Sequence, residues 1–247
     1  MVKLGFLIIM NALPSISAQI DEKNILKVIR NNYSSLGPFF ISMTSNWFVG
    51  AYKNYNDIDK YVIIIYLINK DLLFYRRNGI NIDYDTFYKD RVLEIEKINI
   101  SDISKDLEIP KESVRRKVAE LEKMGEIKKI GKKIFLNRSA IHTAQAKNTL
   151  SELCILLHEF NKLLKKDKLS NNIFDLNEIN KSIKNNFTFC WYQFYKFMFI
   201  YLNRWKKEVN DLETFCIAQV VVVNAAQNKE FKPSKSTMKS WREEIMG

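Results

Sequence analysis

Residues that break helices are scarce in this chain. Its 247 residues include only 7 glycines and 4 prolines, which argues against a fold built from many turns. Apolar residues make up 47% of the sequence, enough for a large core in one extended domain or in two. Stretches with helical periodicity recur, whereas strand-like alternation is clear only at residues 126–137. The expected fold class is therefore mainly α with a small β-hairpin.

Cysteine and histidine are also few. Cys154, Cys190 and Cys216 are odd in number, widely spaced and set in apolar helical patterns. This spacing suggests no disulfide framework and indicates buried, reduced thiols in a cytoplasmic protein. His142 and His158 have no cysteine or carboxylate at convincing ligand spacing. We therefore expect no zinc site and no other cofactor.

Recognisable catalytic and membrane signals are missing. The sequence has no glycine loop for phosphate, no nucleophile elbow and no convincing carboxylate pair, so we expect no enzymatic activity. A membrane-spanning helix needs about 20 apolar residues. Polar residues interrupt both long apolar stretches, residues 61–75 and 187–203. We expect these stretches to be buried between helices or at a subunit interface, with no membrane contact.

Positive charge is concentrated in one part of the chain. The 39 lysines and arginines exceed the 28 acidic residues and give a net charge of +11. Residues 111–138 hold ten basic and four acidic side chains, so over half of the excess falls in this segment. The phosphates of a nucleic acid would be attracted to this surface first.

Residues 97–138 have the pattern of two short helices joined by a tight turn. A first helix is predicted from Ser101, an N-cap residue type, with Ile103 and Leu107 on one face. It should end before Pro110, because the residue that precedes proline avoids the α conformation and proline suits the start of the next helix.

A second helix and a hairpin follow in the pattern. Val114, Val118 and Leu121 recur at helical spacing and are expected to pack on the first helix. Gly125 then ends the second helix as a C′ glycine. Residues 126–137 alternate around a glycine as two short strands with a turn between them.

This segment resembles the winged helix-turn-helix transcription regulators, both the MarR-like kind and the DNA-binding domain of the Crp-like kind. The likeness rests on residues 109–116 (IPKESVRR) and 121–127 (LEKMGEI), which resemble a recognition helix and the step into the wing. It covers about a sixth of the chain. It implies a sequence-specific regulator that binds double-stranded DNA with residues near the start of the recognition helix in the major groove.

By that resemblance, base-edge contacts fall to the start of the second helix, and backbone contacts fall to its serine and to the wing. The residues expected to contact DNA are Lys111, Glu112, Ser113, Arg115, Arg116 and Lys117 on the second helix, and Lys128, Lys129, Lys132 and Lys133 on the wing.

Two alternatives stay open at this point. Winged helices also serve as protein-interaction or scaffold modules without DNA readout, and a lysine-rich helix face is often only a solvated one. Glu112 could pair with Arg115 or Arg116 within the helix instead of reading a base. The sequence names neither an operator nor a small-molecule effector.

The rest of the chain divides by its helical patterns. An echo between residues 56–65 and 210–219, each after an aromatic helix, indicates either one helical pair used twice or a chance similarity. Asn56 or Asp57, and Asn210 or Asp211, would cap the second helix of each pair. The expected units are a leader and helix at 1–35, a helical pair at 36–79, the winged helix-turn-helix at 84–140, a connecting helix at 144–168, a second helical pair at 178–228 and a tail at 229–247.

Dimerisation and the N-terminus carry two further expectations. The connecting helix could form the seam of a homodimer, which would match two DNA half-sites about one helical turn apart. Residues 1–19 have the outline of a signal peptide, although Asn11 and Pro14 interrupt the apolar run. The alternative is a plain N-terminal segment, with either Met1 or Met10 as the start.

Overall fold

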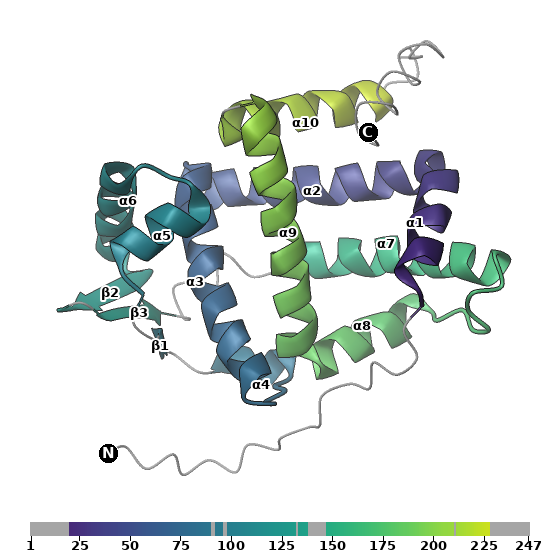
Figure 1. Ribbon diagram of the computed structural model, residues 1–247, viewed down its shortest axis with the longest axis horizontal. Coiled ribbons are helices and arrows are strands. Elements are labelled where there is room, and N and C mark those ends of the chain that lie inside the picture. The colour runs from purple at the N-terminus through teal and green to yellow at the C-terminus, as the bar shows by residue number, and fades with distance from the viewer. Residues whose placement is uncertain are drawn as a thin grey trace.

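The described part of the chain folds into ten helices and one three-stranded sheet in the computed structural model (Figure 1). The structure describes residues 20–89, 92–95, 98–131, 133–137, 147–209 and 211–227. The expected mainly α class with a small antiparallel hairpin is confirmed. The helices are α1 (Glu22–Asn31), α2 (Tyr33–Tyr55), α3 (Ile58–Arg77), α4 (Tyr84–Lys89), α5 (Ile100–Leu107), α6 (Lys111–Lys123), α7 (Lys147–Lys166), α8 (Leu176–Asn185), α9 (Phe187–Val209) and α10 (Leu212–Gln227), and the strands are β1 (Val92–Ile95), β2 (Ile127–Ile130) and β3 (Lys133–Asn137).

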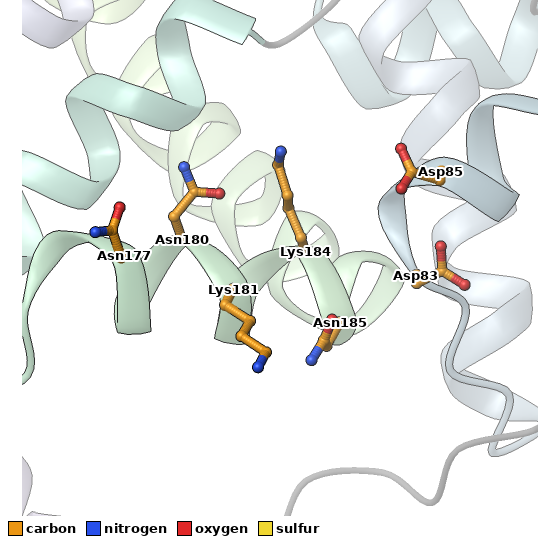
Figure 2. Close-up of a pocket in the computed structure, with 7 residues that line it drawn as sticks. All are labelled: Asp83, Asp85, Asn177, Asn180, Lys181, Lys184 and Asn185. Carbon is orange, nitrogen blue, oxygen red and sulfur yellow. The ribbon is translucent and has the colours of Figure 1, made fainter.

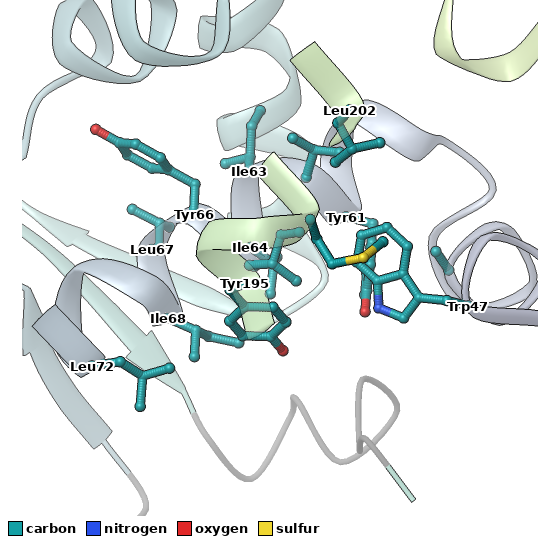
Figure 3. Packing of buried hydrophobic residues seen from close by; sticks show 14 of the residues in the cluster. Trp47, Tyr61, Ile63, Ile64, Tyr66, Leu67, Ile68, Leu72, Tyr195 and Leu202 are labelled. Atoms are coloured by element: carbon teal, nitrogen blue, oxygen red, sulfur yellow. The ribbon is translucent and has the colours of Figure 1, made fainter. Parts of the chain in front are cut away.

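Helix α3 lies at the centre of the core. It contacts α2, α5, α6, α9 and α10, and neighbours therefore cover it on several sides. Its consecutive residues Ile63, Ile64 and Ile65 are all fully buried, which a surface helix with one apolar stripe would not allow. Figure 3 shows Ile63 and Ile64 of α3 in one cluster with Trp47 from α2 and Tyr195 from α9. The expected burial of the apolar stretch 61–75 is confirmed for most of its length.

The two helical pairs pack on one another reciprocally. The second helix of each pair contacts the first helix of the other, α3 on α9 and α10 on α2. Asp57 caps α3 by accepting a hydrogen bond from the Lys60 amide, and Asp211 accepts one from the Thr214 amide at the start of α10. Asn56 instead ends α2 in a left-handed conformation, with φ of 50°. The internal duplication itself stays a prediction.

Helices α1, α7 and α8 complete the body. Figure 1 shows α2 and α7 side by side, with α10 along another side of α2. Leu150, Cys154 and Leu164 on α7 are buried, whereas Leu157 of the same helix is 37% exposed. The second helical pair begins later than expected, because residues 176–185 form the separate helix α8, which ends where the Asn186 amide bonds to the Ser182 carbonyl.

Helix α9 is only partly buried. Phe187, Trp191 and Met198 lie in the core, but Phe197 and Ile200 on another face are 46% and 64% exposed. The expected burial of residues 187–203 is therefore confirmed for the inward face of α9 and not for its outward face. Within the described ranges, no helix has the length and apolar character that a membrane-spanning helix needs.

Helices α5 and α6 lie with the sheet at one end of the molecule, beside α3 (Figure 1). The N-cap of α5 is Asn99, which corrects the prediction of Ser101. The Asn99 side chain accepts from the amides of Ser101 and Asp102, and the Asp102 carboxylate accepts from the Asn99 amide. This reciprocal pair of bonds satisfies free helix amides better than a serine two residues later could.

The turn, the second helix and the hairpin follow the predicted pattern. Glu108 takes a left-handed conformation between α5 and α6, and Pro110 is the N-cap of α6. Val114 and Leu121 are completely buried, as is Ile103 on α5. Gly125 follows α6 with φ of 76°, a conformation that favours glycine.

Strand β1 was not predicted. It pairs antiparallel with β3, so the sheet order is β1-β3-β2 and Leu93 lies opposite Leu136. With four residues, β1 is too short for alternation to distinguish it from a loop. The leader 1–19, the tail 229–247 and His142 lie outside the described residues.

The cysteines agree with the expectation of unpaired thiols. Cys154 and Cys216 are buried and Cys190 is half-buried, and none of the three forms a disulfide. Burial raises the pKa of Cys190 to about 11 and that of Cys216 to about 12, so both thiols stay protonated at neutral pH.

Replacement of a central leucine should be costly. Leu67→Ala removes most of a fully buried side chain from α3 and leaves a cavity in the core. The free energy of unfolding should therefore fall by about 2 to 5 kcal/mol. Urea denaturation measures this loss. The matched variant Leu26→Ala, at a leucine 43% exposed on α1, should change stability by less than about 0.5 kcal/mol. Equal effects in the two variants would contradict the central position of α3.

Candidate nucleic-acid interface

Helix α6 has one buried face and one exposed, charged face. Val114, Val118 and Leu121 pack inward, while Lys111 and Glu112 at the start of the helix are exposed. The side chains of Arg115 and Arg116 on the following turn are 59% and 71% exposed, and Ser113 is half-buried. The structure therefore brings five of the six predicted α6 residues to or near the same surface.

The exposed arginines have acidic partners on their own helix. Arg115 Nη1 lies 2.9 Å from Glu112 Oε1, so Glu112 does form the intrahelical pair that the sequence left open. Arg116 Nε is 3.9 Å from Glu120 Oε1, a looser approach. Exposed pairs of this kind contribute only about 0 to 1 kcal/mol. Either arginine can therefore exchange its carboxylate for a phosphate or a base at little cost.

Lys117 does not belong to this surface, which corrects its prediction as a DNA contact. Its side chain is only 10% exposed, and its ammonium forms an ion pair with Asp57 and lies 3.5 Å from Asp59 Oδ2. Position 117 is three residues after Val114 and four before Leu121, so helical spacing puts it on the buried face. That spacing is visible in the sequence and could have excluded Lys117.

Several long-range contacts hold α5 and α6 against the body. Lys60 on α3 pairs with Glu120 on α6 at 2.9 Å, beside the pairs of Lys117. Tyr66 donates a hydrogen bond of 2.6 Å to Asp106 on α5, which also pairs with Lys70 at 3.0 Å. These bonds oppose rotation of α6 relative to α3.

Lys206 on α9 holds the turn between α5 and α6. Its ammonium donates to the carbonyl oxygens of Leu107 at 2.9 Å and Glu108 at 2.7 Å, which are free acceptors at the end of α5. Partial burial lowers the pKa of Lys206, and the charges of Asp59 and Glu108 oppose that shift. Since Lys206 is far from the turn in the chain, no local pattern predicted this contact.

The hairpin adds lysines next to the end of α6. Lys128 on β2 is exposed and Lys129 is half-buried. The Lys129 amide donates to Glu122 Oε1 at 2.9 Å, which ties β2 to the last turn of α6. Lys132 and the side chain of Lys133 lie outside the described residues.

A buried carboxyl group lies at the junction of α6 and β2. Glu126 is only 5% exposed, and its Oε2 atom has no hydrogen-bond partner among the described residues. Burial raises the pKa of Glu126 to about 7, and the Tyr55 hydroxyl partly offsets this shift. Glu126 is one of the four acidic residues of segment 111–138, but it lies beneath the charged surface of that segment.

One hollow lies away from α6. It has a volume of about 380 Å³ between α4 and α8 and is shown in Figure 2. Its lining residues are Asp83, Asp85, Asn177, Asn180, Lys181, Lys184 and Asn185. A smaller hollow of about 310 Å³ lies between α3, α5 and α9. Among the described side chains, no group of three or more histidines, cysteines and carboxylates could hold a metal ion.

Comparison of the chain with known protein families, with curated proteins and with solved structures finds no match. Function must therefore be argued from the charged face of α6 and its surroundings.

The ion pairs of Lys117 should stabilise the fold. Lys117→Met leaves Asp57 and Asp59 without their buried cation and should lower the free energy of unfolding by on the order of 3 kcal/mol. Urea denaturation gives this value. Lys123→Met, at an exposed lysine of the same helix, is the matched control and should have little effect. A Lys117→Met protein as stable as the control would rule out this stabilising role.

Glu126 should make stability depend on pH. Its folded pKa of about 7 exceeds the ordinary pKa of 4.5 for a glutamate, so the folded state binds an extra proton between these values. The free energy of unfolding should therefore fall as pH rises from about 5 to 7, by roughly 2 kcal/mol, and level off above that. Urea denaturation of wild type and Glu126→Gln at each pH isolates this contribution. Parallel pH profiles of the two proteins would contradict it.

Proposed function

We propose that the chain binds double-stranded DNA through α6 and the β2–β3 hairpin and acts as a sequence-specific transcriptional regulator. The observation that carries the proposal is the cationic start of α6, where Lys111, Arg115 and Arg116 are exposed on a helix whose opposite face is fixed to the body. A cationic helix of fixed orientation suits the reading of base edges in a major groove.

The chemistry of base reading follows from these side chains. Arginine or lysine can donate to O6 and N7 of guanine, and glutamate can accept from N4 of cytosine. Arg115 and Glu112 are paired in the free protein and would separate, or turn together, on a base pair. Since their pair is exposed, its loss costs about 0 to 1 kcal/mol, less than the roughly 1 to 3 kcal/mol that a good base contact contributes to discrimination.

The hairpin would hold the DNA backbone. Lys128 is exposed on β2, Lys133 begins β3, and Lys132 precedes Lys133 in the sequence. Lysines at these positions can neutralise phosphates and release counterions, which makes affinity fall with salt. These contacts position the protein without distinguishing one sequence from another.

The winged helix-turn-helix is the part of the proposal that concerns fold. Helices α5 and α6, the intervening turn and the β1-β3-β2 sheet correspond in order to the elements of such a domain, in support of the resemblance of residues 109–127. In this proposal Lys117 and Lys206 position α6 and do not touch DNA. The regulator would act in the cytoplasm as a homodimer on two half-sites.

Binding to a pool of random duplex fragments, followed across a salt series, tests the proposal. Wild type should bind with steep salt dependence and enrich a recurring sequence. Arg115→Ala with Arg116→Ala should abolish the enrichment, since each lost base contact removes about 1 to 3 kcal/mol of discrimination. Lys128→Ala should weaken binding to all sequences alike and reduce the salt slope by about one.

The matched control removes two exposed arginines elsewhere. Arg30→Ala with Arg77→Ala lowers the net charge equally, on α1 and α3, and should retain the sequence preference. If circular dichroism shows every variant folded and the wild type binds no duplex even at low salt, the proposal fails. The α5–α6 segment would then be an interaction or scaffold module without DNA readout.

A further inference from the structure

The outward face of α10 is apolar and uncharged. Ile217 and Val221 are 65% and 59% exposed, and Ala218 between them is also exposed. Residues 214–227 include no charged side chain, in a chain of which 27% is charged. Residues 214, 217, 218, 221 and 224 fall on one side of the helix at helical spacing. Among the described residues, this face of α10 therefore lacks the charge that covers most exposed helices.

The opposite face fixes α10 to the body. Phe215 stacks on Trp205 at a centroid distance of 4.8 Å and meets Phe48 at 5.7 Å. Gln219 donates hydrogen bonds to Tyr201 on α9 and, at 3.3 Å, to Thr44 on α2. These contacts hold the inward side of the helix, so the exposed stripe is presented in a fixed orientation. Figure 1 shows α10 at one edge of the molecule, along α2.

The exposed residues of α10 are arranged symmetrically about position 219, so their order is the same from either end of the helix. Ile217 and Val221 lie two residues on either side of position 219, and Thr214 and Asn224 lie five residues on either side of it. Two such helices packed antiparallel would place Ile217 against Val221 and polar Thr214 against polar Asn224. This self-complementarity is what an isologous two-fold contact requires.

We infer that this face binds α10 of a second copy of the chain, antiparallel across a two-fold axis. Two molecules with a net charge of +11 repel one another, so their contact is favoured where neither carries charge. The small side chain of Ala218 lies next to the axis and allows the two helices to approach closely. Solvent would be removed from Ile217 and Val221 of both copies, which drives the association.

A contact of this size should be reversible. A contact of one helix face on another belongs to the class of small, transient interfaces, so the dimer should dissociate on dilution. The inference concerns self-association alone and is tested without DNA. Its failure and the failure of DNA binding can therefore be distinguished.

Sedimentation equilibrium of the full chain across the micromolar range is the test. Wild type should sediment as a mixture of monomer and dimer, and Ile217→Lys with Val221→Lys should be monomeric, because four lysines would meet at the axis. Leu26→Lys with Leu157→Lys is the matched control on α1 and α7 and should retain the dimer. Circular dichroism shows whether each variant is folded.

A second variant reports the symmetry. Ala218→Cys should form a disulfide-linked dimer on mild oxidation, whereas Asn24→Cys on α1 should not, and the native thiols are buried or half-buried. A monomeric wild type at every concentration would overturn the inference, as would a dimer that the double lysine variant leaves intact. Dimerisation only after removal of residues 229–247 would also overturn it, since the tail would then be the occupant of this face.

Discussion

Helix α3 is the element that joins the core to the charged helix α6. Its middle is buried from all sides, and its first turn carries the carboxylates that pair with Lys117. Lys60 in the same turn pairs with Glu120, and Tyr66 two turns later bonds to Asp106 on α5. The orientation of α6 therefore depends on a helix that cannot move without disturbing the core. Rigid attachment of this kind is what a base-reading helix needs, because a small misorientation removes a hydrogen bond.

The charge of the chain is used in two different ways. Buried or half-buried cations, chiefly Lys117 and Lys206, neutralise carboxylates or bind carbonyl oxygens and so fix the position of α6 and of the preceding turn. The exposed arginines on α6 form only weak ion pairs with glutamates of the same helix, and Lys128 on β2 is exposed. These cations can therefore exchange their present surroundings for a phosphate or a base. The sequence count of charge in residues 111–138 does not separate these two classes. The two classes are separated only by the burial of each side chain, which places Lys117 and Glu126 in the interior.

The parts of the fold that the sequence predicted are those with local causes. Proline at position 110, glycine at 125 and the spacing of Val114, Val118 and Leu121 determine the turn, the helix and its end, and all are observed. Strand β1 and the contact of Lys206 with the turn depend on residues distant in the chain, so no local sequence pattern predicts them. The burial of Lys117 lies between these cases, because its helical spacing was informative but its residue type favoured the surface. The assignment of α6 to DNA stays a proposal.

Hydrogen–deuterium exchange of the full chain, with and without a duplex enriched from random fragments, tests the central claim most directly. Bound DNA should slow amide exchange in α6 and in the β2–β3 hairpin, because phosphates and base edges would cover their exposed sides. Exchange in α1, α7 and α8 should stay unchanged, since none of these helices packs extensively on α6 in the described part of the chain. Protection confined to those helices, or no protection at a duplex concentration that saturates the protein, would contradict the account.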